Sequence, residues 1–176
     1  MVQFRLVREP LMENNLSSCT IRQRVGIGIL PVDIVKTDSS HKIIMTQGKF
    51  EIVDLTEEKN RKNILDALGL SSHELDERCP VQIASAGHSK VMIGIKTREK
   101  LNGLQPNFQS LADISQEIGC TGYFVFTLDS DENDILTHGR MFAPAIGIPE
   151  DPVTGNANGP LGGYLVHHKL LVQCKT

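Results

Sequence analysis

Apolar and polar positions along this chain follow two different periods, which predict a mixture of strands and helices. Between residues 19 and 46 they alternate in short runs, the two-residue period of β-strands. Residues 81–86 and 90–95 repeat that pattern on either side of a Gly-His-Ser turn, and residues 123–127 form a dense apolar run. We therefore predict strands in each of these segments, with the second and third paired as a hairpin.

Two further segments show the three-to-four-residue apolar spacing of amphipathic helices. In residues 56–68 the inward face carries Ile64, Leu65 and Leu68, and residues 107–118 repeat this spacing with phenylalanine, leucine and isoleucine. Each helix has a predicted cap at its start and a glycine after its end: Thr56 and Gly69 for the first, Asn107 and Gly119 for the second. The predicted order is strands, helix, hairpin, helix and strand.

The pattern of residues 140–171 predicts a strand, a polar turn and a buried helix. Ile135, Met141 and Phe142 are the apolar anchors of the strand. The turn is dense in residues that suit tight turns, namely Pro149, Pro152, Gly155, Asn156, Asn158 and Gly159. We expect Asn158 or Gly159 to cap the helix, with Pro160 at the first helical position.

A helix that starts after such a turn can bind an anion. Its first N–H groups lack partners within the helix and carry a partial positive charge, so they can hold a carboxylate or a phosphate. Asp151 lies just ahead and is a candidate for orienting a substrate amine or for moving a proton. The structural alternative is that Asp151 only caps the turn. Spacing alone favours that alternative, because glycine-rich turns before helices are common.

The longer motifs resemble a known family. RMFAP followed by EDPVTGNANGPLGGYLVHH is similar to the signature of the PhzF family of phenazine-biosynthesis-like isomerases. Upstream motifs resemble the same family in the same order: GILPVDIV, IIMTQGKF, ILDALGLSSHELDERCP, GHSKVMIGIK and GCTGYFVF. The resemblance covers residues 19–171, and the EDPVTGNANGP run is more specific than any short glycine pattern.

This resemblance implies an α+β fold of the diaminopimelate epimerase-like kind. Such proteins have two similar halves, each a curved mixed β-sheet or barrel around a central helix, with the site in the crevice between them. In this chain the resemblance implies a partial first-half sheet domain at residues 1–55. A second-half domain is implied at residues 56–176, with its central helix near residues 159–169. One half is therefore expected to be incomplete.

The resemblance also assigns site residues. Asp151 is implied as the site aspartate, and Gly155, Asn156 and Ala157 as the turn that holds the anion. Asn156 stands where the phenazine enzyme itself has a serine. His88, in the Gly-His-Ser turn, is implied to lie at the rim of the crevice and contact substrate. From the residues alone, an exposed hairpin tip is the preferred interpretation for His88.

The implied activity is an isomerase that moves a proton at a carbon atom of a small carboxylic acid, without metal or organic cofactor. The family's general-base glutamate and its CGHAT-like motif have no match here, and residues 1–16 correspond to the end of its first central helix. We therefore expect little or no isomerase activity from the isolated chain. A cofactor-independent racemase or epimerase is one alternative, although it needs a thiol at each helix start and GNANGPLG has no cysteine. A non-catalytic binding or oligomerisation protein is the other.

Composition and charge disfavour several classes of binding partner. The net charge of −3 and the lack of any Lys/Arg cluster disfavour nucleic acid, and no apolar run approaches the ~20 residues of a membrane span. Cys19, Cys79, Cys120 and Cys174 are widely spaced, which predicts reduced thiols in a cytoplasmic protein rather than disulfides or a zinc site. The partial sheet exposes an apolar face, so a homodimer is expected.

Overall fold

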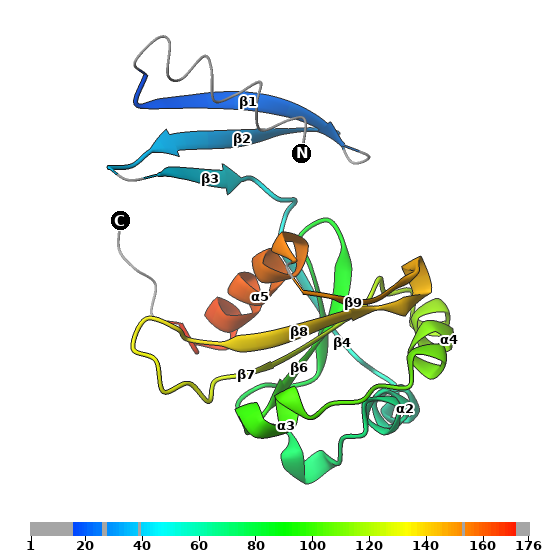
Figure 1. The fold of residues 1–176 in the computed structure, drawn as a ribbon. Coiled ribbons are helices and arrows are strands. Elements are labelled where there is room, and N and C mark those ends of the chain that lie inside the picture. Colours follow the sequence, from blue (N-terminus) through cyan, green and yellow to red (C-terminus); the bar gives the residue numbers. More distant parts are fainter. Residues whose placement is uncertain (1–15, 26–27, 39, 153, 172–176) are drawn as a thin grey trace. The chain divides into compact units, whose positions relative to one another are not determined.

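The computed structural model describes residues 16–25, 28–38, 40–152 and 154–171 (Figure 1). Backbone contacts divide the chain into two compact units, Met1–Gln47 and Gly48–Thr176. The predicted domain assignment of 1–55 and 56–176 stays a prediction. Each unit is described by itself below.

The first unit is a three-stranded antiparallel sheet in the order β1-β2-β3. Its strands are β1 (Ser18–Val25), β2 (Gly28–Lys36) and β3 (His41–Met45). The pairs Ile21↔Val32↔Met45 form one row across the sheet. Since side chains alternate between faces, the register gathers most of the apolar residues on one face and leaves Ile29, Val35 and Ile44 on the other. The strands predicted between residues 19 and 46 are therefore confirmed.

The second unit contains a six-stranded mixed sheet in the order β4-β5-β6-β7-β8-β9. Its strands are β4 (Glu51–Asp54), β5 (Gln82–Ser85), β6 (Ser89–Ile95), β7 (Tyr123–Thr127), β8 (His138–Ala143) and β9 (Ile148–Asp151). Only β6 and β7 pair in parallel, and α3 (Arg98–Asn102) and α4 (Phe108–Ile118) form the crossover between them. The remaining helices are α2 (Glu58–Leu68) and α5 (Gly155–His167), with 3-10 turns at Ser72–Glu74 and Pro144–Ile146.

Helices cover both faces of this sheet. Val91, Ile93 and Ile95 of β6 pack into one apolar cluster with α2 and α4, whereas Met92 packs into a second cluster with α5. Because successive side chains of β6 point to opposite faces, α2 and α4 pack on one face of the sheet and α5 packs on the other, as Figure 1 shows. This arrangement confirms an α+β fold.

The helix boundaries partly confirm the sequence predictions. The Asn107 side chain accepts a hydrogen bond from the Ser110 N–H at 3.1 Å, and Gly119 ends α4 with φ 68°. Gly69 likewise ends α2 with φ 67°. The predicted Thr56 cap is wrong, because α2 begins one residue later with Glu57 as its N-cap, whose carbonyl accepts the Asn60 N–H at 3.0 Å.

The predicted hairpin is present. Ser85 and Ser89 close the antiparallel ladder between β5 and β6, so the turn consists of residues 86–88. Gly87 has φ 115°, a backbone angle that favours glycine over residues with a Cβ.

Candidate functional site

The first turn of α5 lies within the C-terminal run EDPVTGNANGP and is partly open to solvent. Thr154 is the N-cap, but its side chain makes no capping hydrogen bond, and no acidic residue lies in the first turn. Gly155 and Asn156 are exposed to solvent. The Thr154 side chain therefore does not compete for this positive helix end, and its exposed residues allow the turn to accept an anion.

The predicted start of this helix is wrong. The helix begins at Gly155, so Asn158 and Gly159 are helical and Pro160 lies inside the helix rather than at its first position. Burial explains the difference, because Ala157 and Pro160 both pack into the interior and fix the first turn as helix. Pro160 has no N–H, so the Asn156 carbonyl loses its usual helical donor.

Ala157 and Asn156, two of the implied anion-binding residues, differ in their exposure and in their polar groups. Ala157 is fully buried, and its N–H already donates to the Thr154 carbonyl at 3.3 Å. Asn156 is exposed and carries a side-chain amide as well as its backbone groups. Asn156 is therefore the better placed of the two to contact a ligand.

Asp151 is the last residue of β9 and pairs with Met141 of β8. It is half-buried and lies three positions before the Thr154 cap. The Asp151 carboxylate and the positive end of α5 therefore lie in the same short segment of the chain. An acid–base group beside an anion site is the combination that proton movement on a carboxylic acid requires.

An ion pair fixes the strand that carries Asp151. Arg140 of β8 donates two hydrogen bonds to Glu150, at 2.7 and 2.8 Å. The same guanidinium donates to the Leu101 and Leu104 carbonyls at 3.1 and 3.0 Å, where α3 ends. The hydrogen bonds from Arg140 hold the pKa of Glu150 below its usual range. Arg140 therefore ties β9 to the body of the unit one residue before Asp151.

The packing of α5 fixes the direction of the helix. Tyr164 is fully buried, donates to the Pro80 carbonyl at 2.6 Å and meets the Phe126 ring edge-on at 5.7 Å. Burial raises the pKa of Tyr164, so its hydroxyl remains a neutral donor. At the other end, the His168 ring lies 2.6 Å from the Gln82 side-chain oxygen, and Gln82 donates to Asp54 at 2.7 Å.

His88 is an exposed residue of the turn between β5 and β6, as the structural interpretation predicted. Within the described residues its side chain makes no hydrogen bond or ion pair, whereas its carbonyl accepts a bond from Lys90 at 3.4 Å. No hydrogen bond or ion pair among the described residues joins the His88 imidazole to Asp151 or to the first turn of α5, so its contact with substrate stays a prediction.

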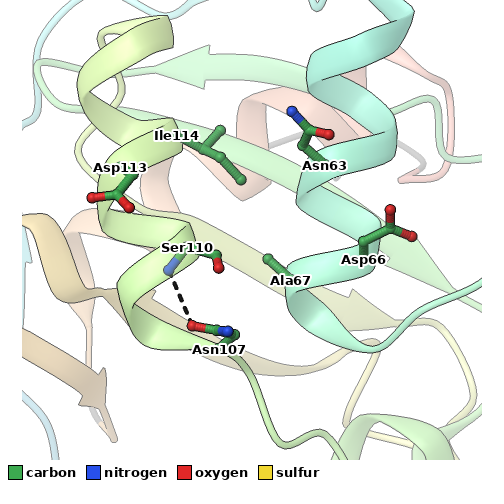
Figure 2. Close-up of a pocket in the computed structure, with 7 residues that line it drawn as sticks. All are labelled: Asn63, Asp66, Ala67, Asn107, Ser110, Asp113 and Ile114. Carbon is green, nitrogen blue, oxygen red and sulfur yellow. Dashed lines mark hydrogen bonds between the residues drawn. The ribbon is translucent and has the colours of Figure 1, made fainter.

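A separate groove lies between α2 and α4, on the sheet face opposite α5. It encloses about 400 Å³ and is lined by Asn63, Asp66, Ala67, Asn107, Ser110, Asp113 and Ile114 (Figure 2). Some of its polar groups already have partners, since Asn107 caps α4 through Ser110 and Asp113 accepts a hydrogen bond from Gln109, outside the groove lining, at 3.0 Å. None of its residues belongs to the C-terminal signature run.

Comparison with known proteins identifies the family. The family model described as phenazine biosynthesis-like protein matches residues 7–176. The chain belongs to the PhzF family. The family resemblance predicted from the motifs is thereby confirmed.

Curated relatives of this PhzF chain are named as isomerases. An uncharacterized isomerase of Clostridium acetobutylicum is 55% identical over 90% of this chain and 53% of its own length. The uncharacterized isomerase YddE of Escherichia coli K12 is 44% identical over 89% of this chain and 52% of its own length. A PhzF-family crystal structure from Bacillus anthracis superposes with a TM-score of 0.72 at 28% identity, covering 89% of this chain and 53% of that one. The chain thus spans about half the length of these relatives.

One more distant relative of this PhzF chain has a specific name. A trans-2,3-dihydro-3-hydroxyanthranilate isomerase of Pseudomonas fluorescens is 32% identical over 60% of this chain and 34% of its own length. Among the residues that the structure describes, no helix is long and apolar enough to cross a membrane. Nor do three His, Cys, Asp or Glu side chains gather there as a metal site.

The sequence prediction for this PhzF chain missed one residue of the α5-bearing sheet face. Lys90 of β6 is buried, with 4% of its surface exposed, in a strand whose following residues are apolar. A lysine between the polar turn and the run VMIGI was the available signal, because lysine is rarely fully buried.

Proposed function

We propose that this chain supplies the carboxylate-binding part of a PhzF-type isomerase site, at which a proton moves on a carbon atom of a small carboxylic acid. The observation that carries the proposal is the exposed first turn of α5, which comes directly after Asp151 and whose N-cap Thr154 offers it no side-chain acceptor. In this site the first turn binds the carboxylate, and Asp151 orients the substrate or moves its proton. We propose further that the site works without metal or organic cofactor and that the protein is cytoplasmic.

The proposal divides the activity between this chain and the remainder of the family protein. The relatives named as isomerases are about twice as long as the matched region, and no residue of this chain is assigned as the general base. We therefore expect the 176-residue chain alone to catalyse little or no proton exchange, and a protein that also contains the other half to catalyse it.

Hydrogen exchange from solvent tests the proposal. Candidate amino and hydroxy acids, including 2,3-dihydro-3-hydroxyanthranilate, are incubated with protein in deuterated water and analysed by mass spectrometry and NMR. The expected result is deuterium at a carbon atom of one acid with the two-half protein and almost none with the 176-residue chain. Robust turnover by the short chain would contradict the division of roles. Absence of exchange with the two-half protein across the panel would contradict the isomerase proposal.

The racemase or epimerase alternative receives less support. Two-base exchange through thiols needs an accessible thiolate beside the helix start. Cys79 and Cys120 are buried free thiols, and burial raises the pKa of Cys79 to about 12. No cysteine lies in the first turn of α5.

A second function, homodimer formation, is favoured by one face of the β1–β3 sheet. The register places seven apolar residues on it: Cys19, Ile21, Leu30, Val32, Ile34, Ile43 and Met45. Val32 and Ile34 of the central strand are already buried, at 5% and 6% exposed, whereas Ile43 and Met45 remain 46% and 50% exposed. The opposite face is more polar and includes Thr20 and Asp33, which share a hydrogen bond of 2.6 Å. We infer that two copies bury these apolar faces against each other.

Two neighbouring isoleucines provide a matched test of the homodimer. Ile43 lies on the apolar face and Ile44 on the opposite one, and their exposed fractions are similar, 46% and 43%. Ile43→Glu is expected to convert the dimer to monomer, because a charge would be buried in an apolar interface. Ile44→Glu should leave it dimeric. Light scattering after gel filtration gives the masses, and a monomeric wild-type chain or equal effects of both changes would rule out this interface.

A further inference from the structure

Lys90 is a buried cation on the sheet face that carries α5. It lies on the same face as Met92, two residues along β6, and as its register partner Ala84 of β5. Both Met92 and Ala84 belong to the apolar cluster that packs α5. The neighbouring position on β7 is Gly122, whose carbonyl accepts the Val91 N–H at 2.9 Å. An added Cβ at Gly122 would meet the Met141 side chain and the Phe142 carbonyl, so this part of the sheet face is closely packed.

The charge of Lys90 is poorly compensated by the residues around it. Its ammonium makes one hydrogen bond, of 3.4 Å, to the His88 carbonyl. Among the described residues no ion pair joins it to an Asp or Glu, and burial raises the pKa of the nearby Cys120 thiol. Burial lowers the pKa of the Lys90 amine. An ammonium has three donors, and burying it with one long bond is unfavourable.

A purely structural role explains this arrangement poorly. The hydrogen bond from Lys90 to the His88 carbonyl lies at an exposed turn. It therefore offsets little of the free-energy cost of burying the charge. The acceptor of that bond, His88, is exposed together with Gly87, so the buried ammonium is bonded to a turn at the protein surface. An incoming carboxylate would offer a shorter, charge-assisted bond than the carbonyl does.

We propose that Lys90 is the buried cation that binds the carboxylate of the substrate, together with the first turn of α5. The inference rests on the proposed function and names a residue of the same site. It assigns recognition of the acid group to β6 as well as to α5, and leaves proton movement to Asp151 and the remaining half of the site. Lys90 is accordingly a binding residue for carboxylates.

The test compares Lys90→Met with Lys96→Met. Methionine has nearly the shape of the lysine stem but no charge, and Lys96 also donates to a single backbone carbonyl, that of His73, at 2.7 Å, from an exposed position. Without ligand, Lys90→Met is expected to raise the melting temperature, because the uncompensated charge is gone. Lys96→Met should not raise it. A lower melting temperature for Lys90→Met would overturn the proposal, since Lys90 would then hold the fold together.

Binding provides the second measurement, with anthranilate as a stable aromatic carboxylate probe. Calorimetric titration is expected to show at least a tenfold weaker affinity for Lys90→Met, a partial recovery for Lys90→Arg and no change for Lys96→Met. Equal affinity of Lys90→Met and wild type would overturn the proposal.

Different results would contradict the isomerase proposal and the binding role of Lys90. If the two-half protein exchanges protons and Lys90→Met leaves its KM unchanged, the inference is wrong and the isomerase proposal stands. If no acid exchanges but anthranilate binding still depends on Lys90, the carboxylate site stands and the isomerase proposal is wrong.

Discussion

Asp151→Asn is expected to abolish proton exchange in a two-half PhzF protein, lowering its rate by roughly 100- to 10,000-fold, the usual contribution of a positioned acid–base group. Asparagine keeps the shape of the side chain but cannot take up a proton. Because Asp151 ends β9 and pairs through its backbone with Met141, the change leaves the ladder intact. The rate of deuterium incorporation is the measurement, with the melting temperature as a check on folding.

Asp113→Asn is the matched control for Asp151. Asp113 is an exposed aspartate in the groove between α2 and α4, on the opposite face of the sheet. The same chemical change there should leave exchange within about twofold of wild type, since surface substitutions away from a site have small effects. Full activity of Asp151→Asn would remove Asp151 from the mechanism, and an equal loss in both variants would show a general effect of lost charge.

Gly94→Ala is expected to destabilise the second unit by about 1–3 kcal/mol or more, a large share of a typical total of about 5–15 kcal/mol. Gly94 lies inside β6, and an added Cβ would overlap the Cβ of Cys79 and approach its Sγ to 2.8 Å. A Cβ cannot move without its backbone, and the Asp76 N–H is bonded to the Gly94 carbonyl at 3.0 Å in the same segment. Denaturant unfolding measures the loss.

A double-mutant cycle identifies the cause of that loss. Cys79→Gly removes the two closest of the three atoms that an alanine at 94 would meet and leaves only Phe126 Cζ at 3.3 Å, so Gly94→Ala should cost much less in that background. Gly162→Ala provides a second control, because an added Cβ meets nothing within 4 Å there and helix propensity favours alanine by roughly 1 kcal/mol. Additive effects of the 79 and 94 changes would contradict the steric explanation.

Local sequence signals correctly predicted helix ends and turns where a single residue determines the backbone conformation. Asn107 and Gly119 mark the ends of α4 because a side-chain acceptor and a residue tolerant of positive φ are needed there. The hairpin around Gly87 was predicted for the same reason. Apolar alternation also predicted the strands, since one-sided burial imposes it.

The start of α5 could not be predicted in that way. Glycine, asparagine and proline favour turns, so GNANGP indicated a loop. The burial of Ala157 and Pro160 against the sheet overrides those propensities. Burial is also what makes Lys90 notable, and it depends on the register with Ala84 and on the position of Gly122, which are contacts distant in sequence. The family motifs, by contrast, identified Asp151 and the α5 turn as candidates without the fold.

The missing side-chain cap on α5 has a practical consequence for finding the substrate. The exposed Asn156 amide lies in a turn whose Thr154 cap gives it no side-chain acceptor. An acid that binds there must change the chemical shift of that amide and slow its exchange with water. Two-dimensional NMR spectra of labelled protein can therefore rank a library of acids by occupancy, with no turnover needed. The turn itself becomes the reporter, and a substrate can be sought before its product is known.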